Sequence, residues 1–189
     1  ISFILGISHK PYFNYKSLIK KFCKEKASAI ICSSQEQMNS IYPLNINVFN
    51  INDSHSGEII NINQKKDCQK LDIFWEGMGV SLNNLKLLRN IDESLLKKIN
   101  FHIVSDLNYF KFFNRFVKKD AIKEIEKLNI TYNLYEWNYD NLNKISNNCD
   151  IAIIPLNKNA MNKGRSLNKL LLMHRLGLVT LCSDIESYN

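Results

Sequence analysis

Short apolar runs alternate with stretches of helical spacing along most of the chain, and this alternation constrains the fold more than any other feature. The longest series of apolar runs occupies residues 71–77, 99–106, 130–137, 150–156 and 178–184. The intervening stretches are predicted to be helical at residues 83–98, 109–129, 138–149 and 166–177. Strands that alternate with helices build a parallel sheet covered by helices. We therefore predict an α/β fold with a doubly wound parallel sheet.

A shorter β-α-β pattern precedes this series. Residues 15–26 and 34–42 have helical character, and apolar runs follow them at 27–34 and 46–53. The next residues lose hydrophobic periodicity and gather Ser, Asn, Gly and Lys, which is typical of a linker. With 189 residues the chain is long enough for one domain and part of another. We predict an incomplete first domain at 1–55, a linker at 56–70, and a second domain at 71–189 that is truncated at its C-terminus.

The net charge of +7 favours anionic partners, but the lysines are spread over helical stretches and form no compact arginine-rich stripe. A nucleic-acid-binding function would rest on charge alone, so no nucleic-acid partner is predicted. Nucleotide phosphates are the candidate anionic partners. A peripheral contact with an anionic membrane surface is a further candidate. The alternative is that most of these charges only solvate exposed faces.

Cysteine and histidine spacing gives no sign of a metal centre. The five cysteines include no C-x-x-C pair and the four histidines are dispersed, so we predict neither a metal cofactor nor a disulfide framework. A reducing, cytoplasmic setting follows, with Cys32 and Cys182 as small core residues. No apolar run approaches the roughly 18 to 20 residues of a membrane span.

Two glycines follow the run at 71–77. Gly77 and Gly79 allow close backbone approach of a ligand, and free N–H groups before a helix hold phosphate well. The third glycine of a dinucleotide fingerprint is absent, because Leu82 occupies its position. A tight strand-to-helix turn is therefore an equal alternative.

The segment from Lys163 to Lys169 is the best candidate phosphate site. Lys163, Arg165 and Lys169 bracket a point where the chain is expected to enter a helix, with Ser166 as N-cap and Leu167, Leu170 and Leu171 on the buried face. Cations are unfavourable near a helix N-terminus, so their clustering there is easier to explain if an anion binds. The alternative is that these long side chains extend into water.

Trp137 follows another apolar run and is a candidate border for a nucleobase. The alternative is that Trp137 packs in the core beside Tyr135, which is the more common role of a tryptophan at such a position.

The chain from about Ala29 to Tyr188 resembles glycosyltransferases of the GT-B type, which have two facing Rossmann-like domains. The resemblance rests on the order of the runs and is most specific from Asp150 onward. An aspartate-led run ending in proline, "DIAIIPL", is followed there by a basic loop with "SLNKLL", a glycine and a last apolar run. It implies that residues before about Asp53 belong to the acceptor-side domain and the rest to the donor-binding domain.

The resemblance also implies transfer of a sugar from a nucleotide-activated donor to a saccharide acceptor, often without a metal, as in polysaccharide biosynthesis. By this resemblance Arg165 and Lys169 would contact the diphosphate, Ser166 and Asn168 phosphate or ribose, and Gly77 would allow close approach. Trp137 and Asn138 would then border the base. No catalytic residue can be assigned.

The chain departs from the family pattern at two points. Leu172 stands where many members have the second of two glutamates, and residues 81–84 contain no arginine or lysine. A non-catalytic, Rossmann-like interaction domain is therefore the alternative function.

Overall fold

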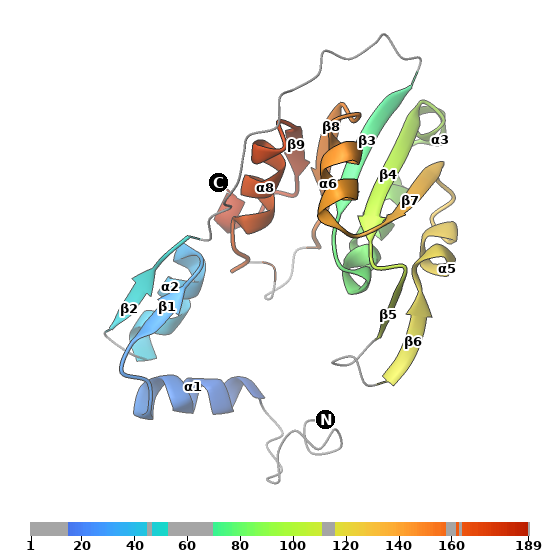
Figure 1. Ribbon diagram of the computed structural model, residues 1–189. Coiled ribbons are helices and arrows are strands. Elements are labelled where there is room, and N and C mark those ends of the chain that lie inside the picture. Colours follow the sequence, from blue (N-terminus) through green and yellow to red (C-terminus); the bar gives the residue numbers. More distant parts are fainter. Residues whose placement is uncertain are drawn as a thin grey trace.

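The computed structural model describes residues 15–44, 47–52, 70–110, 116–157, 162 and 164–188. The predicted linker lies outside the described residues except for Lys70. Figure 1 shows a small group of N-terminal elements beside a larger sheet. The N-terminal elements are α1 (Tyr15–Glu25), β1 (Ile30–Cys32), α2 (Gln35–Ile41), η1 (Tyr42–Leu44) and β2 (Val48–Asn50).

The larger part contains the elements after the linker. Its strands are β3 (Leu71–Glu76), β4 (Ile99–Ser105), β5 (Asn108–Phe110), β6 (Phe116–Asp120), β7 (Tyr132–Glu136), β8 (Ile151–Ile154) and β9 (Val179–Cys182). Its helices are η2 (Gly79–Asn90), α3 (Glu93–Leu96), α5 (Ala121–Glu126), α6 (Tyr139–Ser146), α8 (Asn168–Arg175) and η3 (Glu186–Tyr188), of which η2 and η3 are 3-10 helices.

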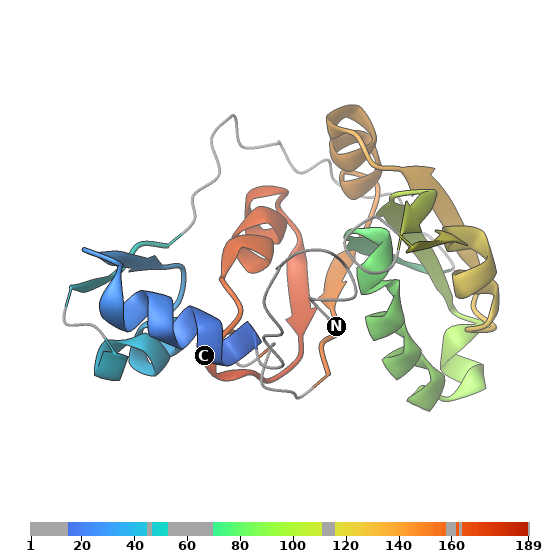
Figure 2. The same cartoon turned by 90° about the horizontal axis from the view of Figure 1, so that it is seen from below.

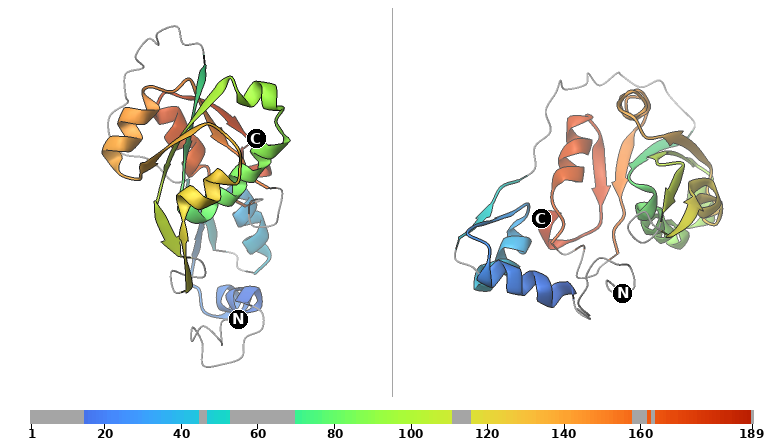
Figure 3. Two further views of the ribbon diagram at one scale, coloured as in Figure 1. Left: turned by 90° about the vertical axis from the view of Figure 1, so that its right-hand side faces the viewer. Right: turned by 60° about the horizontal axis from the view of Figure 1, so that its bottom comes forward.

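Five of these strands form one parallel sheet in the order β7-β4-β3-β8-β9. Three consecutive central residues of β3, Ile73 to Trp75, are buried, because helices cover both faces of the strand. The left panel of Figure 3 shows helices on both sides of the sheet. The predicted α/β fold with a helix-covered parallel sheet is confirmed. The two N-terminal strands, β1 and β2, form a separate parallel pair.

Alternation along the strands divides the apolar residues between two cores. Trp75 and Phe101 pack with η2 and α5 on one face. Phe74 and Val104 pack with α6 and α8 on the other, where Met173 is fully buried. The first core therefore holds η2 and α5 against the sheet, and the second core holds α6 and α8.

The start and end of α8 differ in how well the sequence predicts them. Gly177 adopts φ 73°, and the amides of Gly177 and Leu178 donate to the carbonyls of His174 and Met173 in a Schellman arrangement. The predicted N-cap is wrong, because Leu167 precedes the helix and makes no side-chain capping bond. The expected apolar face is also only partly correct, since Leu171 is exposed.

The segment predicted as helix at 109–129 contains a β-hairpin instead. Strands β5 and β6 pair antiparallel, with Tyr109 opposite Lys119, and α5 begins only after Asp120 caps it. Aromatic residues favour strands as well as the apolar face of a helix, so their spacing alone does not decide between the two. The side chain of Tyr109 packs against the backbone of Gly79, a tertiary contact that favours the hairpin.

The cysteine prediction is half correct. Cys32 is buried, whereas Cys182 is exposed. Cys182 lies on β9, which has only β8 as a neighbour in the described sheet. An edge strand is less covered, so an apolar run at this position does not imply burial.

Candidate functional site

The order of the parallel strands defines one position where ligands are expected. The connection after β3 passes through η2, on the first core face, and the connection after β8 leads to α8, on the second. Since β3 and β8 are adjacent, their connections diverge at the carboxyl ends of the two strands, which is where doubly wound sheets bind ligands as a rule. The residues at this topological switch point are therefore the first to consider.

Lys169 reaches the switch point from the first turn of α8. Its Nζ donates a hydrogen bond to the backbone carbonyl of Glu76, the last residue of β3, and lies 3.6 Å from Glu76 Oε2. It also lies 4.9 Å from the centroid of the Trp75 ring, within the range of a cation–π interaction. Both charged side chains are only 15% exposed. The ion pair is thus largely shielded from solvent.

The surroundings of Lys169 have opposing effects on the pKa of its ammonium group. Burial lowers the pKa of its ammonium group, Glu76 raises the pKa, and Arg165 lowers it. Arg165 is therefore close enough to act on the same group. Glu76 compensates the positive charge that a phosphate would otherwise compensate.

Trp137 follows β7 and also meets Glu76. Its indole Nε1–H donates to Glu76 Oε1 at 3.1 Å. The centroids of the Trp137 and Tyr139 rings lie 5.4 Å apart, and the ring planes are inclined by 59°. The indole is 41% exposed, so the alternative of core packing is wrong. An exposed indole held at one edge offers a flat apolar face to a ring-shaped ligand.

Asn138, the neighbour of Trp137, is the N-cap of α6. Its side-chain oxygen accepts from the amide of Asn141 at 2.7 Å. This local role accounts for the residue type without a ligand.

The two glycines after β3 are packed by other parts of the chain. The amide of Gly77 donates to Val104 and that of Gly79 to Asp106 Oδ2 at 3.0 Å. A Cβ on Gly77 would meet Lys169 Nζ at 2.9 Å. Close approach does require glycine here, but the approaching groups belong to the protein. The expected free N–H groups are not offered by these two residues.

The basic loop before α8 is described in part. Lys163 lies outside the described residues. Arg165 donates through Nη1 to Asn162 Oδ1 at 3.3 Å, and the buried Asn162 donates to the carbonyl of Asn157 at 2.7 Å. Burial raises the pKa of the Tyr188 hydroxyl, and the positive charge of Arg165 opposes this shift. The guanidinium is therefore anchored by a neutral amide.

The remaining predicted residues of this segment lie at the start of α8. Ser166 precedes α8 and Asn168 is its first residue, and both are half-buried. Of the predicted set, Gly77, Trp137 and Lys169 converge on Glu76. Glu76 itself is the residue that sequence reasoning missed, although its place at the end of an apolar run was the available signal.

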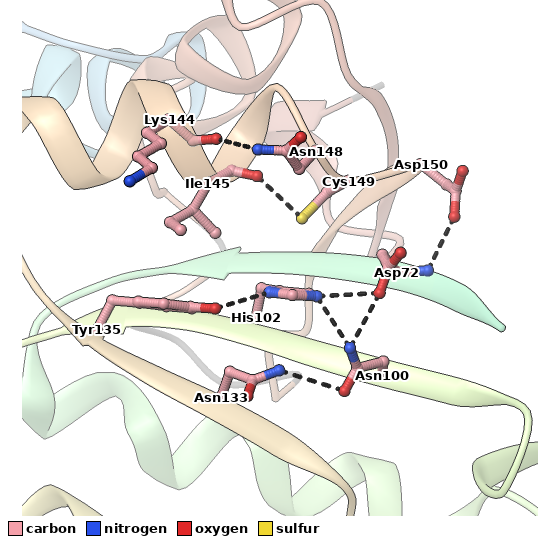
Figure 4. A network of polar contacts seen from close by, with 10 residues as sticks. All are labelled: Asp72, Asn100, His102, Asn133, Tyr135, Lys144, Ile145, Asn148, Cys149 and Asp150. Carbon is pink, nitrogen blue, oxygen red and sulfur yellow. Dashed lines mark hydrogen bonds and ion pairs between the residues drawn. The ribbon is translucent and has the colours of Figure 1, made fainter. Parts of the chain in front are cut away.

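A second polar cluster lies on β3, β4 and β7, with Asp72 and Asn100 near the amino ends of β3 and β4. Figure 4 shows His102 between Asp72 and Tyr135. His102 Nε2 lies 3.0 Å from Asp72 Oδ1, its Nδ1 lies 3.3 Å from the Tyr135 hydroxyl, and Asn100 donates to the same Asp72 oxygen at 3.0 Å. Glu76 lies four positions after Asp72 along β3, or about 13 Å away at the usual rise of a strand. This cluster is therefore distinct from the switch point.

Comparisons with known proteins add no assignment. The chain matches no model of a known protein family, and a search of curated proteins finds no match either. Within the described ranges, no helix is long and apolar enough to cross a membrane. Among the same residues, no group of three or more His, Cys, Asp or Glu is arranged to hold a metal ion.

Proposed function

We propose that this chain binds the nucleotide-activated sugar of a glycosyltransferase at the carboxyl ends of β3 and β8. The observation that carries the proposal is the convergence of Lys169, Trp137 and Gly77 at the switch point of a parallel sheet. A cation and an exposed indole at that position match the two unlike parts of a nucleotide, which are its charged phosphates and its flat base.

The basic residues would neutralise the diphosphate. Arg165 is anchored only by an amide oxygen among the contacts described for its guanidinium, so it can turn toward an anion without breaking an ion pair. Lys169 must exchange Glu76 for phosphate or share the two. Stabilising the departing diphosphate in this way requires no covalent chemistry from the protein. The acceptor saccharide would be held by the first domain, as the resemblance to GT-B glycosyltransferases implies.

Calorimetric titration with UDP, GDP and their sugars tests the proposal. Each charge-assisted phosphate contact contributes on the order of 1.5 to 3 kcal/mol. Arg165→Gln is therefore expected to weaken nucleotide binding by about tenfold or more. Arg89→Gln is the matched control, because Arg89 is exposed and bonds only to the carbonyl of Lys127 among its described contacts. Absence of binding by the intact full-length protein to any of these ligands would sink the proposal.

A second candidate is a non-catalytic interaction domain with a Rossmann-like fold. The Glu76–Lys169 ion pair favours it, because the carboxylate of Glu76 already compensates the positive charge of Lys169. Leu172, in place of an expected glutamate, favours it too. Assays of sugar transfer and donor hydrolysis by the full-length protein separate the two candidates. Detectable turnover that Arg165→Gln abolishes would rule out the non-catalytic alternative.

A further inference from the structure

The N-terminal elements hold the basic loop directly. In Figure 2, α8 and β9 lie between these elements and the rest of the large sheet. The carbonyl of Gly164 accepts two hydrogen bonds from α2 and its cap, one from Gln37 Nε2 at 2.7 Å and one from Ser34 Oγ at 3.1 Å. These bonds join residues more than 120 positions apart. They connect the separate β1–β2 pair to the loop that carries Arg165.

The donors of these two bonds are themselves fixed. Gln37 Oε1 accepts from the amide of Ser33 at 3.1 Å and from its hydroxyl at 3.3 Å, which orients the side-chain amide so that Nε2 faces Gly164. Ser34 caps α2 by accepting from the amide of Gln37, and its side chain is buried. An amide and a hydroxyl held this way lose little freedom when they bind the loop.

The loop is shaped to accept this contact. A Cβ on Gly164 would lie 3.2 Å from Gln37 Cγ, so glycine permits the close approach of α2. The next residue, Arg165, donates its own amide to the carbonyl of Asn162 at 3.2 Å and its guanidinium to the side chain of Asn162. The contact with α2 is therefore made by the residue next to Arg165.

We propose that Ser34, Gln37 and Gly164 form a latch that positions Arg165 for an anionic ligand. Gln37 and Ser34 are positioning residues that act through the loop and do not touch the ligand. Ligand binding at the loop and docking of the N-terminal elements are then coupled, and the coupling is reciprocal. The inference rests on the proposed nucleotide site for its ligand, and on the two hydrogen bonds to Gly164 for the latch itself.

Gln37→Met tests the latch, since it keeps the length of the side chain and removes the amide. Gln35→Met is the matched control, because Gln35 lies in the same helix, is exposed, and bonds to Asn39 within that helix. The first readout is the rate of hydrogen exchange of the Arg165 backbone amide, which is measured by NMR in the absence of ligand. We expect Gln37→Met to accelerate it about tenfold, as loss of one positioned hydrogen bond shifts a local opening equilibrium by that order. Equal exchange in the two variants would overturn the latch.

The second readout is calorimetric titration with UDP. Gln37→Met is expected to weaken binding about tenfold, because apparent affinity falls with the population of the positioned loop. Gly164→Ala, which pushes α2 away from the other side, should weaken binding in the same direction. Faster exchange with unchanged UDP affinity would overturn the positioning role. If the unaltered protein binds no nucleotide, the proposed function fails, while faster exchange in Gln37→Met still supports the latch.

Discussion

The Glu76–Lys169 ion pair predicts a measurable coupling between two residues that are 93 positions apart. At 3.6 Å, two unit charges attract by about 4 to 5 kcal/mol in a medium of effective dielectric constant about 20. Desolvation offsets part of this, since both side chains are 15% exposed. We expect a coupling free energy of about 2 kcal/mol, above the roughly 0.2 to 1 kcal/mol of exposed pairs and below the full cost of breaking a buried one.

A double-mutant cycle measures this coupling. The variants are Glu76→Gln, Lys169→Met and their combination, and the quantity measured is the free energy of unfolding in urea at neutral pH. Lys21 and Glu25 form a matched control cycle, because their charges are 3.9 Å apart while their side chains are 64% and 49% exposed. The control coupling should be a few tenths of a kcal/mol. Equal couplings in the two cycles would refute the claim that burial strengthens the pair at the switch point.

The loss of stability caused by Glu76→Gln is predicted to depend on pH. Burial lowers the pKa of Lys169 and Glu76 raises it, so Glu76→Gln should lower this pKa further. Between the folded pKa and the ordinary value near 10.4, the unfolded chain binds more protons than the folded one, so stability rises with pH. The destabilisation caused by Glu76→Gln should therefore shrink between about pH 7 and about pH 10. A deficit that stays constant over this range would show that the uncompensated ammonium is not its cause.

Three further predictions concern the stability of the fold. Gly79→Ala should lower the free energy of unfolding by about 1 to 3 kcal/mol, because its Cβ would clash with the ring of Tyr109; an unchanged urea midpoint would contradict this. Met173→Ala should cost about 2 to 5 kcal/mol, since this side chain is fully buried, and thermal unfolding is the measurement. Asp72→Ala should cost about 1 to 3 kcal/mol by leaving His102 without its carboxylate partner, whereas Asp72→Asn, which keeps an oxygen, should cost less in the same urea assay.

Periodicity predicted the sheet because its signal is local. The strand at 71–76 contains three consecutive apolar residues that are all buried, as expected when helices cover both faces. Gly177 marks the end of α8 by adopting a left-handed conformation. The hairpin at Asn108–Asp120 was missed for the opposite reason. Its aromatic residues suit two kinds of structure, and a contact with Gly79, far back in the sequence, favours one of them.

The site was less predictable than the sheet because its contacts are long-range. The sequence places Lys169 near a helix start and Trp137 after a strand, and both positions are close to the observed ones. It does not indicate that both side chains meet Glu76, since such a meeting depends on strand order. The order β7-β4-β3-β8-β9 brings β3 beside β8, and only then can a side chain of α8 reach the end of β3.

The ion pair changes what the cluster of cations implies. Clustered cations at a helix start require a compensating negative charge, and Glu76 supplies one for Lys169 from within the chain. The positive charge of Lys169 therefore no longer points to an external anion by itself. Arg165 differs, because the described partner of its guanidinium is the neutral side chain of Asn162. If a diphosphate binds here, Arg165 should contribute most of the new attraction, while Lys169 exchanges one anion for another. Charge removal at Arg165 should then weaken binding more than at Lys169.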